Sequence, residues 1–234
     1  MSVLSTSKLR RLPLGFSTLD TVFLGFELGD FAVLCGNAAS HTCFLLSIRA
    51  QLPPERGGIG SSIAFIDGGN MFNPYLAAEI ARDYGLDSRE ALEKIHVSRA
   101  FTAYQLSSLI LEKLGSTLKR NRFGLLIVSD VTSLFLDRDV PKTEATELFM
   151  KVCAKLSEIA EKKQTIVVTS YLPERSSMRG LFFEAVLFGK SNILIRVRRK
   201  GKILTFALED HPRIKPFTMD FTVEDNSLDS FMEA

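Results

Sequence analysis

Short, almost unbroken apolar runs alternate along the chain with longer amphipathic stretches. Four runs rich in aliphatic and β-branched residues are predicted strands: 31–35 (FAVLC), 62–66 (SIAFI), 123–128 (FGLLIV) and 165–169 (TIVVT). Apolar residues at helical spacing predict helices between them, at about 42–50, 74–85, 103–119 and 142–163. Strands that are apolar on both faces and separated by helices are typical of a parallel sheet covered on both sides. We therefore expect an α/β fold.

After residue 190 the pattern changes to alternation. The run SNILIRVRRKGKILTFAL (191–208) reads as two alternating segments around a Lys-Gly turn, which predicts an antiparallel hairpin, and FTMDF (217–221) predicts a further short strand. No break in composition suggests a second domain. We expect an N-terminal extension (1–12), one core domain (13–222) and an acidic, flexible C-terminal tail (223–234).

Composition adds few constraints. The chain has 234 residues, of which 46% are apolar and 24% charged, as in ordinary globular domains with a buried core. No apolar run approaches the roughly 20 residues that span a bilayer, so we expect no membrane partner. Three cysteines without C-x-x-C spacing (Cys35, Cys43 and Cys153) favour a reducing cytoplasm and no metal site. The net charge of +2 means that a nucleic-acid partner would need local basic patches.

The segment after the first predicted strand has the layout of a phosphate-binding P-loop, G-x-x-x-x-G-K-[ST]. The same eight positions read here Gly36, Asn37, Ala38, Ala39, Ser40, His41, Thr42 and Cys43. The Lys position is Thr42, which is uncharged, and the Ser/Thr position is Cys43, a poor ligand for magnesium. A loop shorter by one residue would instead put Thr42 in the hydroxyl position and His41 in the Lys position.

Four segments resemble, in the same order, the ATPase core of the RecA/RadA recombinases. They are LGFSTLDTVFLGFELGDFAVLCG (14–36), AFIDGGNMFNPYLAAEIARDYGLD (64–87), IHVSRAFTAYQL (95–106) and LLIVSDVTSLF (125–135). The chain is thus similar to an archaeal-type RadA paralogue of the RadC/KaiC-like group. The resemblance implies a RecA-like P-loop ATPase core, with a mostly parallel sheet flanked by helices and a C-terminal antiparallel hairpin.

The resemblance also implies a degenerate nucleotide site. The family's catalytic Glu corresponds to Gly69 and its Walker B Asp to Ser129. Asp130 is adjacent, but one step along a strand should point its side chain to the opposite face. The γ-phosphate sensor positions hold Ser170 and Tyr171. We expect no catalytic residues and weak or absent binding of ATP and magnesium; an active or weak ATPase with an atypical P-loop is the alternative.

Two segments are candidates for binding single-stranded DNA. The family's second DNA-binding loop corresponds to 173–190, which combines cationic and aromatic side chains: Arg175, Arg179, Phe182, Phe183 and Lys190. Inward packing of the phenylalanines is the alternative. The predicted hairpin carries a basic run: Arg196, Arg198, Arg199, Lys200 and Lys202. Phosphate contact and protection of a sheet edge explain this run equally well.

The tail ends in Phe231-Met232-Glu233-Ala234, an F-x-x-A tetrapeptide that resembles the recombinases' self-association motif. Phe231 and Ala234 would then enter two pockets on a RadA-type recombinase. Chance is the alternative, because the chain has 18 phenylalanines. The expected function is to modulate homologous recombination and DNA repair without catalysis, by binding a recombinase, single-stranded DNA or itself. A regulator unconnected with DNA remains the other possibility.

Overall fold

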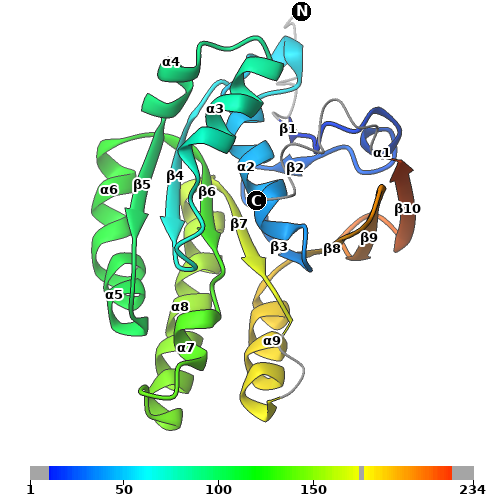
Figure 1. Cartoon of the computed structure of the whole chain (residues 1–234). Coiled ribbons are helices and arrows are strands. Elements are labelled where there is room, and N and C mark those ends of the chain that lie inside the picture. The colour runs from blue at the N-terminus through cyan, green and yellow to red at the C-terminus, as the bar shows by residue number, and fades with distance from the viewer. Residues whose placement is uncertain (1–10, 174–176, 223–234) are drawn as a thin grey trace, which may run out of the picture.

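An eight-stranded sheet forms the centre of the molecule, and the computed structural model describes residues 11–173 and 177–222 of the chain (Figure 1). The strand order is β10-β9-β8-β3-β7-β6-β4-β5. These strands are β3 (Phe31–Cys35), β4 (Ser62–Asp67), β5 (Ile95–Arg99), β6 (Phe123–Ser129), β7 (Ile166–Tyr171), β8 (Ile193–Lys200), β9 (Ile203–Asp210) and β10 (Phe217–Thr222). A separate two-stranded sheet pairs β1 (Arg11–Leu12) with β2 (Phe26–Glu27).

The large sheet is mostly parallel. β3 to β8 run in one direction, and β8, β9 and β10 form an antiparallel meander. The turn between β8 and β9 contains Gly201 in the left-handed conformation (φ +57°), as a tight hairpin requires. The predicted α/β class, the mostly parallel sheet and the C-terminal antiparallel hairpin are confirmed.

Helices cover both faces of the sheet (Figure 1). One apolar core lies under α2 (Ala39–Arg49), α3 (Pro74–Asp83), α4 (Ser88–Glu93) and the N-terminal segment with α1 (Ser17–Asp20). The other lies under α5 (Ala103–Ser108), the π-helical turn η2 (Leu109–Lys113), α6 (Leu114–Arg120), α7 (Ser133–Leu136), α8 (Lys142–Lys163) and α9 (Met178–Lys190). A 3-10 turn, η1 (Pro54–Arg56), follows α2. No helix in the described ranges is both long enough and apolar enough to cross a bilayer.

Capping side chains explain where several helices begin. Asn73, Asp87, Thr102 and Ser177 precede α3, α4, α5 and α9, and each accepts a hydrogen bond from a backbone N–H of the first turn. α2 differs, because its N-cap residue Ala38 has no side-chain acceptor. The first turn of α2 therefore depends on backbone partners, which lie at the candidate site.

Three differences from the sequence-based expectation bear on the predicted sites and domain bounds. α2 begins at Ala39, inside the predicted phosphate loop. Most of the predicted DNA-binding loop 173–190 is helix α9. Arg11 and Leu12, which we expected to belong to the extension, form β1, and Leu12 is fully buried.

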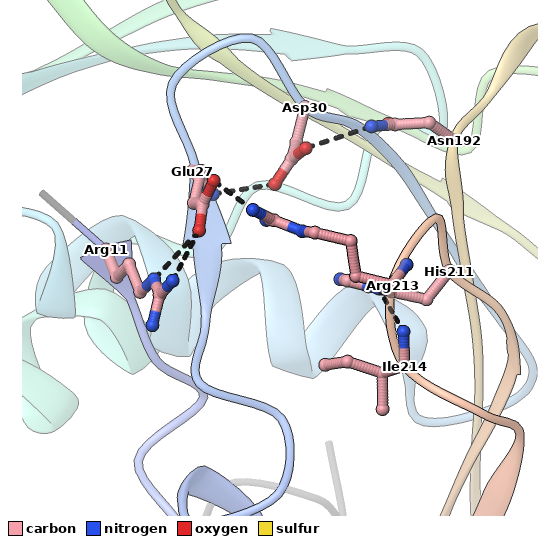
Figure 2. A network of polar contacts seen from close by, with 7 residues as sticks. All are labelled: Arg11, Glu27, Asp30, Asn192, His211, Arg213 and Ile214. Atoms are coloured by element: carbon pink, nitrogen blue, oxygen red, sulfur yellow. Dashed lines mark hydrogen bonds and ion pairs between the residues drawn. The ribbon is translucent and has the colours of Figure 1, made fainter. Parts of the chain in front are cut away.

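A polar network ties the small N-terminal sheet to the loop between β9 and β10 (Figure 2). Glu27 on β2 accepts hydrogen bonds from the guanidinium groups of Arg11 and Arg213, both at 2.8 Å. Asp30 accepts from the backbone N–H of Glu27 at 2.6 Å and from the side-chain amide of Asn192 at 2.9 Å. Residues far apart in sequence are thereby fixed at the amino end of β3.

Candidate nucleotide site and the neighbouring basic hairpin

The turn after β3 can be made only with glycine at its first position. Gly36 has φ +123°, and its N–H donates to the carbonyl of Tyr171 at 3.0 Å. A Cβ at Gly36 would lie 2.3 Å from the carbonyl oxygen of Val197 on β8. Both the left-handed backbone and this close approach exclude a side chain.

Three of the backbone amides that follow are paired within the chain. The N–H of Ala38 donates to the carbonyl of Val197 (3.3 Å), and that of Ala39 to Gly36 (3.1 Å). The N–H of Thr42 donates to Ala38 at 3.1 Å, as the helix has already begun. A P-loop works by aiming such amides at phosphate oxygens. Here the loop is shortened to Gly36–Ala38 and closed on β8.

Asn37 adds a second link between the loop and β8. Its side-chain amide donates to the carbonyl of Arg199, and its side-chain oxygen accepts the N–H of Arg199, both at 2.9 Å. This pair of bonds imitates one step of a β-ladder. It continues the contact of the loop with β8 beyond the sheet.

The side chains of α2 that would serve phosphate and magnesium are turned inward. The Thr42 hydroxyl is buried and donates to the carbonyl of Ala38 at 2.9 Å. Cys43 is fully buried beside Ser170, and burial raises the pKa of its thiol to about 12. Ser40 and His41 lie in the first turn, half-buried. This donor set does not fit ATP with magnesium, and in the described ranges no three His, Cys, Asp or Glu side chains could hold a metal ion.

Asp67, at the end of β4, is the centre of a polar cluster at the carboxyl ends of the parallel strands. Its fully buried carboxylate accepts hydrogen bonds from the N–H groups of Met71 (2.9 Å) and Phe72 (3.0 Å). It also accepts from the Arg99 guanidinium and from the Ser129 hydroxyl, each at 3.0 Å. Ser129, at the Walker B position, thus binds a neighbouring strand. Sequence reasoning missed this role of Asp67, whose only signal is an acidic residue ending an apolar strand.

The expectation that Asp130 points to the opposite face of its strand is wrong. β6 ends at Ser129, and Asp130 takes a left-handed backbone (φ +47°) that turns its side chain toward Gly69. A Cβ on Gly69 would lie 2.8 Å from the Cβ of Asp130 and 3.1 Å from its carboxyl oxygen. Burial raises the pKa of Asp130, and the nearby Asp67 carboxylate acts in the same direction. A carboxyl group therefore stands beside the position where a side chain at residue 69 would begin.

The two residues at the sensor positions hold other elements in place. The Ser170 hydroxyl oxygen accepts the N–H of Asp130 at 2.9 Å. Tyr171 is buried, and its hydroxyl donates to Glu184 of α9 at 2.9 Å. Ser170 is therefore bonded to the β6 end and Tyr171 to α9.

These features define a class. A glycine turn leads from the first parallel strand into a helix, and polar residues gather at the carboxyl ends of the neighbouring strands, as in a RecA-like ATPase core. A family model, Rad51, matches residues 7–185, and the chain belongs to the Rad51 family. The predicted resemblance to RecA/RadA recombinases is thereby confirmed. The Rad51 family is an ATPase family, and membership suggests a recombinase-type function.

β8 runs parallel to β3, so the end of β8 lies beside the loop that follows β3. The basic hairpin is therefore close to the candidate site. Arg198 and Lys200 are exposed, and Arg199 is half-buried with its Nε donating to the carbonyl of Gly201 at 2.9 Å. Arg196, which we predicted to contact DNA, is engaged within the protein instead. Its guanidinium donates to both carboxylate oxygens of Glu209 and approaches Cys35 Sγ at 3.2 Å, so it is engaged inside the structure.

α9 brings two further corrections. Phe183 is fully buried, and its ring centroid lies 4.4 Å from that of Phe149. Arg179 lies over the Phe183 ring and donates to the carbonyls of Asp137 (3.3 Å) and Val140 (3.2 Å). Phe183 is therefore closed to a nucleic acid, and Arg179 is engaged within the protein.

The remaining exposed candidates on α9 are Phe182 and Lys190. Arg175, Phe231 and Ala234 lie outside the described residues. The described candidate surface for DNA is therefore smaller than the sequence suggests. The remaining candidates are Phe182, Lys190, Arg198, Arg199, Lys200 and Lys202.

Proposed function

We propose that this protein is a Rad51-family recombinase paralogue without ATPase activity, which modulates homologous recombination and repair by binding. The observation that carries the proposal is the closed loop. The N–H groups of Gly36, Ala38 and Ala39 pair with carbonyls of the chain, so these three donors are engaged within the protein. The family match supports a role beside recombinases.

Loss of side-chain chemistry supports the same conclusion. Phosphoryl transfer to water depends on a cation at the phosphates, a magnesium ligand and a group that orients the water. The positions that would supply them hold Thr42, Cys43 and Gly69. The protein would act by occupying a position in a recombinase assembly, as a subunit or a ligand. Unlike the recombinase, it would not cycle with ATP.

Calorimetric titration with ATP and magnesium tests the absence of nucleotide chemistry. We expect no binding in the micromolar range and no phosphate release above background. The matched variant carries His41→Gly, Thr42→Lys and Cys43→Thr, which restores the motif but leaves Gly69 and Ser129 unchanged. It should also lack turnover. Micromolar binding with turnover in the unmodified protein would instead establish the working ATPase.

Single-strand binding rests on the basic hairpin. The double variant Arg198→Ala/Lys200→Ala should weaken retention of oligo(dT) at low salt, because each exposed cation can neutralise a phosphate. The control Lys119→Ala/Arg120→Ala removes the same charge from the end of α6, at the opposite edge of the sheet. Equal loss in both variants would show only a general charge effect.

The three cysteines are unpaired, which fits a reducing compartment such as the cytoplasm.

Binding to a recombinase is the third part of the proposal. A pull-down with the purified RadA-type recombinase of the same cell should retain the protein without ATP. Self-association is checked in parallel by light scattering. Absence of both recombinase and oligo(dT) binding would favour a regulator unconnected with DNA.

A further inference from the structure

α9 is apolar on the face that it turns to solvent as well as on the face that it buries. Gly180, Phe183 and Leu187 are buried. The exposed positions on the opposite side of the helix recur at helical spacing and carry no charge; they are Met178, Leu181, Phe182, Ala185 and Gly189. We call these positions the α9 stripe. A helix in contact with water carries polar side chains on its outer face, whereas a helix that is apolar all round is covered on both sides.

The charged residues of α9 do not interrupt the stripe. Arg179 donates to two backbone carbonyls of the segment before α8, and Glu184 accepts the hydroxyl of Tyr171 at 2.9 Å. Lys190 is the last residue of the helix, beyond the stripe. Figure 1 shows α9 beside α8 at the end of this helical layer. A partner can therefore cover the stripe without burying an unpaired charge.

The stripe has large side chains in one half and small ones in the other. Met178 is 82% exposed, and Leu181 and Phe182 are each 42% exposed. Ala185 and Gly189 follow, and a Cβ at Gly189 would meet nothing within 4 Å. In an antiparallel pair of α9 helices, Met178 of each copy faces Gly189 of the other and Phe182 faces Ala185, so large side chains meet small ones. The stripe is thus complementary in size to a second copy of itself.

We propose that two copies of the protein associate through their α9 stripes, as an antiparallel helix pair about a two-fold axis. The pairing names the surface for the self-association considered with the proposed function, and it does not rest on nucleotide or DNA binding. One helix face is smaller than a standard protein interface, so the dimer is weak. We expect monomers at about 1 µM protein and dimers at about 200 µM.

Sedimentation of the full chain across this concentration range tests the pairing. Ala185→Glu places two carboxylates close to the two-fold axis and should raise the dissociation constant of the dimer about 100-fold. Tyr75→Glu is the matched control, because it adds the same charge at a side chain that is 85% exposed on α3, over the other face of the sheet. It should dimerise like the unmodified protein. Monomers of the unmodified protein at about 200 µM, or equal dissociation constants in all three proteins, would overturn the inference.

Cross-linking tests the antiparallel arrangement. Cys35, Cys43 and Cys153 are all buried, so a short bifunctional maleimide joins only thiols that are introduced on the surface. At a rise of about 1.5 Å per residue, the two copies of position 185 lie about 4.5 Å apart along the helix axis and those of position 189 about 16.5 Å apart. Ala185→Cys should therefore cross-link the dimer and Gly189→Cys should not. Equal cross-linking of both variants, or of neither, would overturn the arrangement.

The partners in the proposed function are measured separately, so the two failures differ. A protein that stays monomeric but binds oligo(dT) or the recombinase would overturn the pairing and leave the proposed function standing. Loss of recombinase binding in Ala185→Glu, without any dimer of the unmodified protein, would assign the stripe to the recombinase and likewise overturn the pairing. Dimers that bind neither partner would uphold the pairing and reject the proposed function.

Discussion

At the residue scale, Asp130 already occupies the space beside Gly69. Its carboxyl group lies where a side chain at 69 would have to pass, and Asp67 receives the hydroxyl of Ser129 nearby. No space for a side chain is therefore left beside Gly69. Restoring a side chain at 69 requires displacement of a neighbour that is itself held by a left-handed backbone.

Gly69→Ala should lower the free energy of unfolding by about 1–3 kcal/mol, because its Cβ would lie 2.8 Å from the Cβ of Asp130. Urea unfolding measures the change. In Gly69→Ala/Asp130→Gly the penalty should largely disappear, once the effect of Asp130→Gly alone is subtracted. Gly115→Ala on α6 is the control, since a Cβ there meets nothing within 4 Å, and it should be neutral or stabilising. Equal penalties with and without Asp130 would contradict this packing argument.

At the element scale, α9 shows two neighbouring phenylalanines with different environments. Phe183 packs among Phe135 and Phe149, whereas Phe182 is 42% exposed. Phe183→Ala should lower the free energy of unfolding by about 3–5 kcal/mol. Phe182→Ala should change it by about 0.5 kcal/mol or less, while weakening oligo(dT) binding if bases stack there. A comparable loss of stability in both variants would contradict the assigned faces.

The parallel sheet could be predicted because β3, β4, β6 and β7 are buried on both faces and read as unbroken apolar runs. The closing of the loop could not. It depends on the carbonyl of Val197, more than 150 residues away, which no local pattern reveals. Composition favours a DNA-binding loop at 173–190, but the spacing of Phe183 and Leu187 marks the buried face of a helix.

The environment of Asp67 and Asp130 likewise arises only when separate strands meet. The motif comparison located Ser129 and Asp130 in sequence but did not single out Asp67. It could not show that Ser129 donates to Asp67 or that Asp130 turns toward Gly69. Both depend on contacts between the ends of β4 and β6.

His211, in the loop between β9 and β10, should make the stability of the protein depend on pH. His211 Nδ1 accepts the N–H groups of Arg213 (3.0 Å) and Ile214 (3.1 Å), so this nitrogen must be unprotonated. Burial lowers the pKa of His211 below its usual 6.5, against the opposing effect of the nearby carboxylates of Asp30, Glu27 and Asp210; the Arg213 charge also lowers it.

With a folded-state pKa below the unfolded one, the contribution of His211 is complete above about pH 6.5 and is lost as the pH falls through the folded-state pKa. Urea unfolding between about pH 7 and 5 should show this loss. His211→Asn keeps an acceptor for the two amides and should flatten this part of the profile. His96→Asn, on the exposed side of β5, is the matched control and should leave the profile unchanged. Identical profiles for the unmodified protein and His211→Asn would contradict the prediction.

At the scale of the whole molecule, the thiols report on global unfolding. Cys35, Cys43 and Cys153 are buried in the two cores on opposite faces of the sheet. Burial raises the pKa of Cys35 to about 11 and those of Cys43 and Cys153 to about 12. Little thiolate is therefore present at neutral pH, and no sulfur is exposed to a reagent.

A thiol reagent near pH 8 should react with the native protein only as fast as it unfolds. The urea midpoint for thiol exposure should coincide with that of circular dichroism. Ser116→Cys, on the exposed side of α6, adds a thiol that should react at once and serves as the positive control. Rapid reaction of any native cysteine without denaturant would show local opening of a core.

The amides of Gly36, Ala38 and Ala39 bond to carbonyls of the chain. On the proposed function, the conformation of this end of the molecule would not depend on ATP. ATPases that assemble together change their mutual contacts as ATP is bound and hydrolysed. A family member of this kind would keep the same contacts throughout the ATPase cycle of its neighbours. It would contribute to the geometry of the assembly but not to its nucleotide-driven changes.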